Sequence, residues 1–378
     1  MAKRGHREGS IYRRKDGRWT AEISLEGGKS KFLYGKTRKE AQEKLKTALY
    51  EQQQGLLITG PQQKVGQFLT QWLENVHKQS VRPRTYERYE EIIRLHLVPG
   101  IGHHQLQKLS PQHLQLFYKK KLEEGLSTAT VISFHNMLHK ALETAVRWNI
   151  MTRNTCDLVS PPRRKRFEIQ PLSMPQIHQL LVAACGHRLE ALFILALATA
   201  MRRGELLALK WQDIDTEKGT LQVRRILTKI PGKLPGKGFE EGEPKTDKGR
   251  RSIVLPTFVG EALKQHRVRQ LEAKLKAGAA WQDHDYVFCT SIGTHLNPTR
   301  DVLDVLKSLL EKAGLPNIRF HDLRHSSATM LFGMKVHPKI VQELLGHSQI
   351  SITMDIYSHV LPTMQEETMS KINEAFQE

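Results

Sequence analysis

The sequence has few cysteines and no long apolar segment. Its three cysteines, at positions 156, 185 and 289, are odd in number and far apart, which predicts reduced intracellular thiols and neither a disulfide nor a metal framework. No uninterrupted apolar run approaches the roughly 20 residues of a membrane-spanning helix, and the first residues lack the apolar stretch of a signal peptide. We therefore expect a chain that is neither secreted nor inserted into a membrane.

Acidic residues are also in deficit, because 58 lysines and arginines stand against 39 aspartates and glutamates and leave a net charge of +19. A surface this positive favours a polyanionic partner. Nucleic acid is the leading candidate, since neutralising its phosphates releases counterions, and an anionic membrane surface is the weaker alternative. At about 150 residues per domain, the 378 residues predict two or three domains.

Residues 1–60 have the pattern of a small β-sheet module. Three short alternating runs are separated by glycine-containing turns at 16–17 and 27–28, which predicts a three-stranded antiparallel sheet, and Thr37 is expected to cap a helix over one face. The other face could then meet DNA, as β-ribbon readers do, or its charge could only keep the module soluble. The candidate DNA contacts here are Arg13, Arg14, Trp19 and Lys31.

Residues 64–160 have a helical pattern. An apolar stripe at helical spacing starts at Val65, and further helices are expected after Pro83, from the N-cap Ser110 and from Ser127. Four helices over this length predict a compact bundle.

A connector follows the bundle at residues 160–166, where two prolines precede four basic residues. The prolines exclude a continuous helix, so we expect an extended segment. Arg164 and Lys165 are candidate phosphate contacts, and the alternative is a basic linker that touches nothing.

Residues 168–378 alternate long helices with a short sheet. A capping box at 173–176 opens a helix, and strands are expected at 220–225 and 251–255, with a mobile hairpin loop at 229–244 between them. The predicted fold class is therefore multidomain and mainly α with small β-sheets: a three-stranded sheet plus helix, a helical bundle, and an α-rich domain with a small antiparallel sheet.

Several polar residues of this last domain could carry chemistry. An arginine pair lies at a break between two apolar helices, where it needs an anion, and an H-x-x-R tetrapeptide sets its histidine and arginine on one helix face. Each match is weak by itself, since an arginine could pair with Glu205 and a tyrosine at a helix end could simply pack. In chain order the candidates are Arg202, Lys245, His321, Arg324, His347 and Tyr357.

Together these segments resemble the tyrosine recombinases, and among them the integrases of phages and conjugative transposons. The resemblance rests on Thr-Ala-Met-Arg-Arg-Gly-Glu at 199–205, Lys245, His-Asp-Leu-Arg-His at 321–325, and Leu-Leu-Gly-His-Ser at 344–348 followed by Tyr357. It covers the whole chain, with 1–60 similar to an arm-binding domain, 64–160 to a helical, SAM-like core-binding domain and 168–378 to the catalytic domain. The chain departs from the pattern at Ala200, where the family usually has glycine, and an alanine would be strained if that position needs a positive φ.

The resemblance implies a site-specific recombinase that cuts and rejoins duplex DNA through a 3′-phosphotyrosyl intermediate, without ATP or a required metal ion. Arg202 and Arg324 would hold the non-bridging phosphate oxygens, because guanidinium groups bind them in a bidentate way and stay charged. The other implied roles are Tyr357 as nucleophile, His321 as proton acceptor or phosphate-orienting group, His347 as second phosphate donor and Lys245 as general acid for the 5′-oxygen.

The implied partners are duplex DNA at core and arm attachment sites, three further copies of the chain on two duplexes, and an excisionase or a DNA-bending accessory protein. The protein would integrate and excise a mobile element in the cytoplasm of a bacterial host, at the nucleoid. An apolar C-terminal stripe would dock on a neighbouring copy or pack on its own domain. Its residues are Met364, Met369, Ile372 and Phe376.

Two rival functions and two metal sites were weighed against this interpretation. A type IB topoisomerase shares the chemistry, but the β module argues against it, and a non-catalytic DNA-binding or architectural protein would need no nucleophile. His135 and His139 lack the glutamate of a zinc protease, and Asp213 and Asp215 are expected to form a turn rather than a magnesium site. The sequence therefore predicts no metal.

Overall fold

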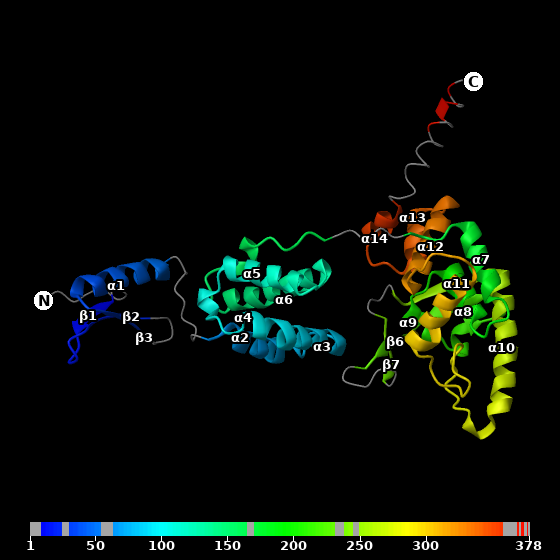
Figure 1. The fold of residues 1–378 in the computed structure, drawn as a ribbon, viewed down its shortest axis with the longest axis horizontal. Coiled ribbons are helices and arrows are strands. Elements are labelled where there is room, and N and C mark those ends of the chain that lie inside the picture. Colours follow the sequence, from blue (N-terminus) through cyan, green and yellow to red (C-terminus); the bar gives the residue numbers. More distant parts are fainter. Residues whose placement is uncertain are drawn as a thin grey trace. The chain divides into compact units, whose positions relative to one another are not determined.

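The computed structural model describes residues 9–24, 30–53, 63–164, 170–230, 238–244 and 249–357, together with positions 369, 372, 373 and 376. Two of the candidate site residues, Lys165 and Lys245, lie outside the described residues, as does Met364. The chain divides into two compact units, residues 1–166 and 167–378, and each is described by itself (Figure 1).

The first unit begins with the predicted sheet and helix. Strands β1 (Ser10–Arg13), β2 (Trp19–Ser24) and β3 (Ser30–Gly35) pair antiparallel in that order, and α1 (Arg38–Gln53) follows. The Glu40 amide donates to Thr37 Oγ1 (3.2 Å), which confirms the helix cap. Small and branched residues bury one face of the sheet under the helix: Ala21, Ile23, Ala41, Leu45 and Ala48.

Four longer helices with their own buried core complete the first unit. They are α2 (Val65–Trp72), α3 (Pro83–Ile92), α5 (Pro111–Glu123) and α6 (Thr128–Arg147), while α4 (Val98–Ile101) is a single turn. Helices α2 and α3 each continue through a π-helical turn, at Leu73–His77 and Ile93–Leu97. The hydroxyl groups of Ser110 and Ser127 accept the amides of His113 and Thr130, as the capping pattern predicts.

The second unit is α-rich with two small sheets (Figure 1). Helix α8 (Glu190–Thr199) is buried and packs against α7, α10 and α12. The other helices are α7 (Met174–Ala184), α9 (Arg203–Leu207), α10 (Thr257–Ala277), α11 (Asp304–Lys312), α12 (Phe320–Gly333), α13 (Pro338–Leu345) and α14 (Ile350–Tyr357). Within the described chain, no helix is both long and apolar enough to cross a bilayer.

The sheets of this unit correct two expectations. Strands β5 (Thr220–Val223) and β8 (Arg251–Val254) pair as predicted, but β4 (Ile214–Asp215) adds a third strand where a turn was expected. The segment expected to be a loop contains β7 (Phe239–Gly242), which pairs antiparallel with β6 (Ile226–Lys229). Phe239 packs against the core of the unit, and this apolar contact explains why the strand forms in a polar stretch.

Candidate active site

The break between α8 and α9 positions Arg202. Helix α8 ends at Ala200, which has a left-handed backbone (φ 52°, ψ 26°), so the anticipated positive φ is real. Arg202 then donates from Nη1 to Glu205 Oε1 (2.8 Å) and from Nη2 to the Gly346 carbonyl (3.2 Å). The expected alternative partner of this arginine is thus present, yet the Arg202 side chain remains 40% exposed and available to a ligand.

Arg324 lies on α12 and is buried beside Arg202. Its Nη1 donates to the Ala200 carbonyl (2.7 Å) and its Nη2 to the Leu345 carbonyl. Burial and the nearby charge of Arg202 lower the pKa of Arg324 to about 9, so it stays charged at neutral pH. Because the two arginines bind the adjacent carbonyls of Leu345 and Gly346, they converge on one point.

A third arginine, which the sequence analysis missed, completes this arrangement. Arg251 at the start of β8 donates from Nε to the Leu344 carbonyl (2.8 Å) and from Nη2 to Glu205 Oε2 (2.9 Å). The last carbonyls of a helix have no partner within it and carry its partial negative charge. The C-terminus of α13 therefore holds three arginines, at Leu344, Leu345 and Gly346. We call Arg202, Arg251 and Arg324 the arginine cluster.

Glu205 binds two members of the cluster, and its side chain is only 1% exposed. Burial alone would raise the pKa of this carboxyl, but Arg251 and Arg202 outweigh burial and hold its pKa below the ordinary value. An ionised carboxylate therefore fixes the spacing of Arg202 and Arg251. The signal for Arg251 was available in the sequence, since period-two alternation puts it on the same face of β8 as the buried Ile253.

Three histidines, His321, His325 and His347, lie near Arg324 in the arginine cluster. The His321 and His325 rings lie 5.0 Å apart, and His347 Nδ1 is 2.9 Å from Thr353 Oγ1 on α14. Burial, together with the nearby charges of Arg324 and Arg202, lowers the pKa of His321 and of His347 to about 4. Both imidazoles are neutral at pH 7, so each has one N–H donor and one unprotonated nitrogen that can accept.

A cavity of about 280 Å³ is lined by Arg202 and His347. Pro244 and Gly249 also line it, and a Cβ at Gly249 would come within 2.7 Å of Pro244 Cβ. The described residues on either side of positions 245–248 therefore both line this cavity. Lys245 follows Pro244 directly, and its role remains a prediction.

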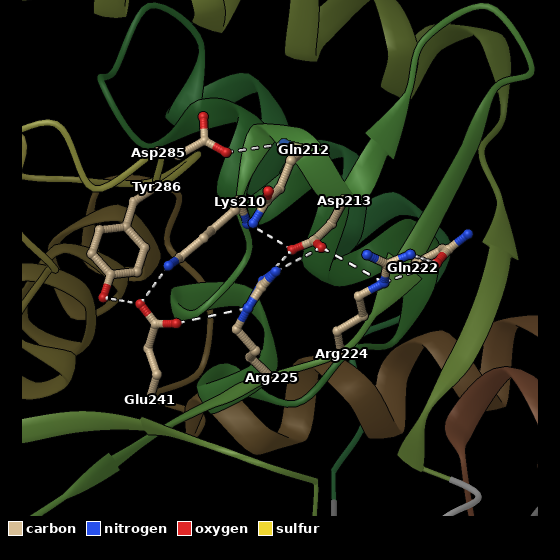
Figure 2. A network of polar contacts seen from close by, with 9 residues as sticks. All are labelled: Lys210, Gln212, Asp213, Gln222, Arg224, Arg225, Glu241, Asp285 and Tyr286. Carbon is tan, nitrogen blue, oxygen red and sulfur yellow. Dashed lines mark hydrogen bonds and ion pairs between the residues drawn. The ribbon is translucent and has the colours of Figure 1, made fainter.

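A polar network anchors the β6–β7 hairpin just before Lys245 (Figure 2). Glu241 on β7 accepts from the Tyr286 hydroxyl (2.7 Å) and pairs with Lys210 (2.8 Å). Arg225 binds both carboxylate oxygens of Asp213 (2.9 Å each) and lies 3.7 Å from Glu241. Asp213 is thus committed to an ion pair.

The histidine pair weighed as a zinc site is likewise committed elsewhere. His135 Nδ1 bonds the Tyr118 hydroxyl (3.0 Å), and His139 Nε2 bonds Asp157 (2.8 Å). Among the residues that the structure describes, no three His, Cys, Asp or Glu side chains gather in a way that could hold a metal ion.

Helix α14 ends at Tyr357. It packs against α12, which carries Arg324, and against α13, whose C-terminal carbonyls bind the arginine cluster. The backbone therefore brings Tyr357 to the same group of helices, and its role as nucleophile remains a prediction.

The predicted DNA contacts of the β module fall on two different faces. Trp19 on β2 is paired with Arg13 on β1 and with Gly35 on β3, and it packs against the core beneath α1. Arg13 therefore lies on the side of the sheet that the helix covers. Lys31 alternates onto the same side. The uncovered side exposes three aromatic rings, those of Tyr12, Phe32 and Tyr34, and Arg14 lies 5.7 Å from the Tyr34 ring centroid. Arg164 is exposed in the connector.

Comparison with known proteins gives matches over both units. The model of the phage integrase family matches residues 171–364, and that of the phage integrase N-terminal SAM-like domain matches residues 64–122. A tyrosine recombinase XerC-like protein of Caldanaerobacter subterraneus subsp. tengcongensis is 36% identical over 361 residues, which cover 92% of each chain.

Two solved structures share the fold at low sequence identity. The Tn1549 transposon integrase in complex with a circular intermediate DNA has a TM-score of 0.68 at 20% identity, covering 80% of this chain and 99% of that one. A lambda integrase tetramer bound to a Holliday junction has a TM-score of 0.57 at 18% identity, covering 94% and 96%.

Proposed function

The chain belongs to the phage integrase family of tyrosine recombinases, and we propose that the arginine cluster, with His321, His347, Lys245 and Tyr357, is the site at which it cuts and rejoins DNA. It is a tyrosine-type site-specific recombinase. The observation that carries the assignment of the site is the convergence of Arg202 and Arg324 on adjacent carbonyls of α13. Residues 122 positions apart in the sequence are thereby held ready for a single anion.

The arginines bind the scissile phosphate in this proposal. The transition state of phosphoryl transfer carries added charge on the non-bridging oxygens, and guanidinium donors fixed beforehand stabilise that charge without reorganising. Tyrosine has a pKa of about 10, so roughly one molecule in a thousand is phenolate at neutral pH. The nucleophile therefore needs both the arginines and a proton acceptor.

Proton transfer completes the proposed reaction. The Tyr357 oxygen attacks phosphorus, the bond from phosphorus to the 5′-oxygen breaks, and a 3′-phosphotyrosyl bond forms. His321 accepts the phenolic proton, since its low pKa leaves a nitrogen free at pH 7. Lys245 protonates the departing 5′-oxygen. Religation by another 5′-hydroxyl reverses these steps, so the bond energy is conserved.

The proposal extends to domains and partners. Residues 1–60 are an arm-type DNA-binding domain, 64–160 a core-binding domain and 168–378 the catalytic domain, and two separate hydrophobic cores in the first unit support the first boundary. The module would meet DNA with the face that exposes Tyr12 and Tyr34, and the connector would follow phosphates with Arg164 and Lys165. Four copies would act on two duplexes in the bacterial cytoplasm at the nucleoid, assisted by an excisionase or a DNA-bending protein.

A suicide substrate tests the proposed site. It carries the end sequence of the element with a nick beside the cleavage site, so that the released fragment diffuses away and the covalent product accumulates. Wild type should become covalently linked to the DNA, and Tyr357→Phe should bind the DNA without linking. Arg324→Ala should lose linkage, but its DNA affinity should stay within roughly tenfold of wild type, because other phosphate contacts dominate affinity. Binding by wild type without a covalent product would refute the proposal. Relaxation of supercoiled DNA lacking the site would indicate a topoisomerase instead.

A further inference from the structure

One hydrogen bond links His347 to the helix that ends at Tyr357. Thr353 lies in the middle of α14, its side chain is fully buried, and its Oγ1 is 2.9 Å from His347 Nδ1. Within the described part of the chain, the structure gives this hydroxyl no second hydrogen-bond partner. Thr353 precedes Tyr357 by four residues, which is about one helical turn.

The direction of this hydrogen bond follows from the cost of burying a donor without an acceptor. If His347 Nδ1 carried a proton, Thr353 would have to accept it, and the hydroxyl proton would then face no acceptor among the described groups. If the hydroxyl donates to Nδ1, every buried proton at this contact has a partner, and only lone pairs of the hydroxyl remain unused. The second arrangement is therefore favoured.

The protonation state of His347 agrees with this direction. Burial, and the nearby charges of Arg324, Arg202, His321 and His325, keep the pKa of this ring at about 4. A neutral imidazole carries one proton, so a ring that accepts at Nδ1 has its proton on Nε2.

We propose that Thr353 is a positioning residue that holds His347 as the Nε2–H tautomer and ties this ring to helix α14. The inference rests on the proposed function, because the Nε2–H group is the one that His347 would offer to a phosphate oxygen. A partner on the other ring nitrogen commonly fixes the tautomer and orientation of a functional histidine. Here the partner is Thr353, on the same helix as the proposed nucleophile Tyr357. A displacement of α14 would therefore move Tyr357 away from the site and release the His347 ring at the same time.

Two variants separate the hydroxyl from the shape of the side chain. Thr353→Val keeps the branched shape and removes the hydroxyl, while Thr353→Ser keeps the hydroxyl. Nitrogen NMR of the full chain with labelled histidine reports which ring nitrogen carries the proton, and His347→Gln identifies the resonance. Wild type and Thr353→Ser should show the proton on Nε2, and Thr353→Val should lose this preference. A proton on Nδ1 in wild type, or an unchanged tautomer in Thr353→Val, overturns the proposal.

The suicide substrate gives the kinetic test. Thr353→Val should slow covalent linkage roughly tenfold, the order seen when a partner of a functional histidine is removed, with unchanged DNA affinity, and Thr353→Ser should restore the rate. In a His347→Ala background, Thr353→Val should cause no further slowing, because the residue acts through the ring. Additive slowing overturns the proposal. If wild type forms no covalent product, the proposed function fails, and the tautomer measurement still decides the role of Thr353.

Discussion

Arg251→Ala should open the C-terminus of α13, although Arg251 lies outside the motifs on which the sequence resemblance rests. The side chain of Arg251 is 8% exposed and gives two of its hydrogen bonds to Glu205 and to the Leu344 carbonyl. Removing one partner of a buried ion pair costs about 3–5 kcal/mol, because the other charge stays buried. At 1.4 kcal/mol per factor of ten, amide exchange of α9 and α13 should accelerate roughly 10²- to 10⁴-fold.

Arg250→Ala is the matched control. Arg250 is adjacent, it pairs with Glu243 at 2.6 Å, and it is 59% exposed, so its ion pair contributes at most about 1 kcal/mol. Hydrogen exchange of the intact chain followed by mass spectrometry reads the peptides of α9 and α13 directly. Equal exchange in the two variants would show that Arg251 does not hold α13, and the account of the arginine cluster would be wrong.

Three further changes test other parts of the site. Ala200→Gly should alter the free energy of unfolding by less than about 1 kcal/mol, because relief of the left-handed backbone offsets the loss of a buried methyl group, and a larger change in a denaturation curve would contradict this. Glu241→Gln should slow covalent linkage to ordinary DNA, and so should Lys245→Ala. A substrate with sulfur as the 5′-leaving atom needs no general acid, so it should restore the rate of both variants. Absence of rescue in Glu241→Gln would show that Glu241 does not act through Lys245. The pKa of Glu205 in the folded protein lies below its ordinary 4.5. The stabilisation from its ionised carboxylate should therefore be complete above pH 4.5 and be lost as pH falls through the folded pKa. If a Glu205→Gln variant lost amide protection of α9 on acidification in parallel with wild type, Glu205 would not be the origin of this pH dependence.

Local chemistry made much of the fold predictable. Ser110, Ser127 and Ser173 each begin a helix because a hydroxyl satisfies amides that the first turn leaves free. The three-stranded sheet of the N-terminal module and its covering helix were also predicted correctly, because turn residues and strand alternation can be recognised within a few residues of sequence.

Strand β7 was expected to be a loop because the contacts that form it come from distant segments of the sequence. Strand β7 is polar by sequence, and it forms because Phe239 meets the core and Glu241 meets Lys210 and Tyr286 (Figure 2). Trp19 was selected as a DNA contact because basic residues flank it, and this role remains a prediction, but its period-two neighbours Ala21 and Ile23 are buried. Alternation within the strand is a better guide to the exposed face than the charge of adjacent residues.

The arginine cluster also explains how a cationic site is held in place without losing its charge. An arginine fixed by a carboxylate is neutralised by it, whereas one fixed by a carbonyl is oriented and stays charged. The three guanidinium groups bind carbonyls at the C-terminus of α13, and among the described residues one carboxylate, that of Glu205, pairs with two of them, Arg202 and Arg251. Two positive charges therefore remain uncompensated within this group. In the proposed reaction a phosphodiester brings one negative charge and its transition state carries more, so we expect this charge to match the transition state more closely than the bound substrate.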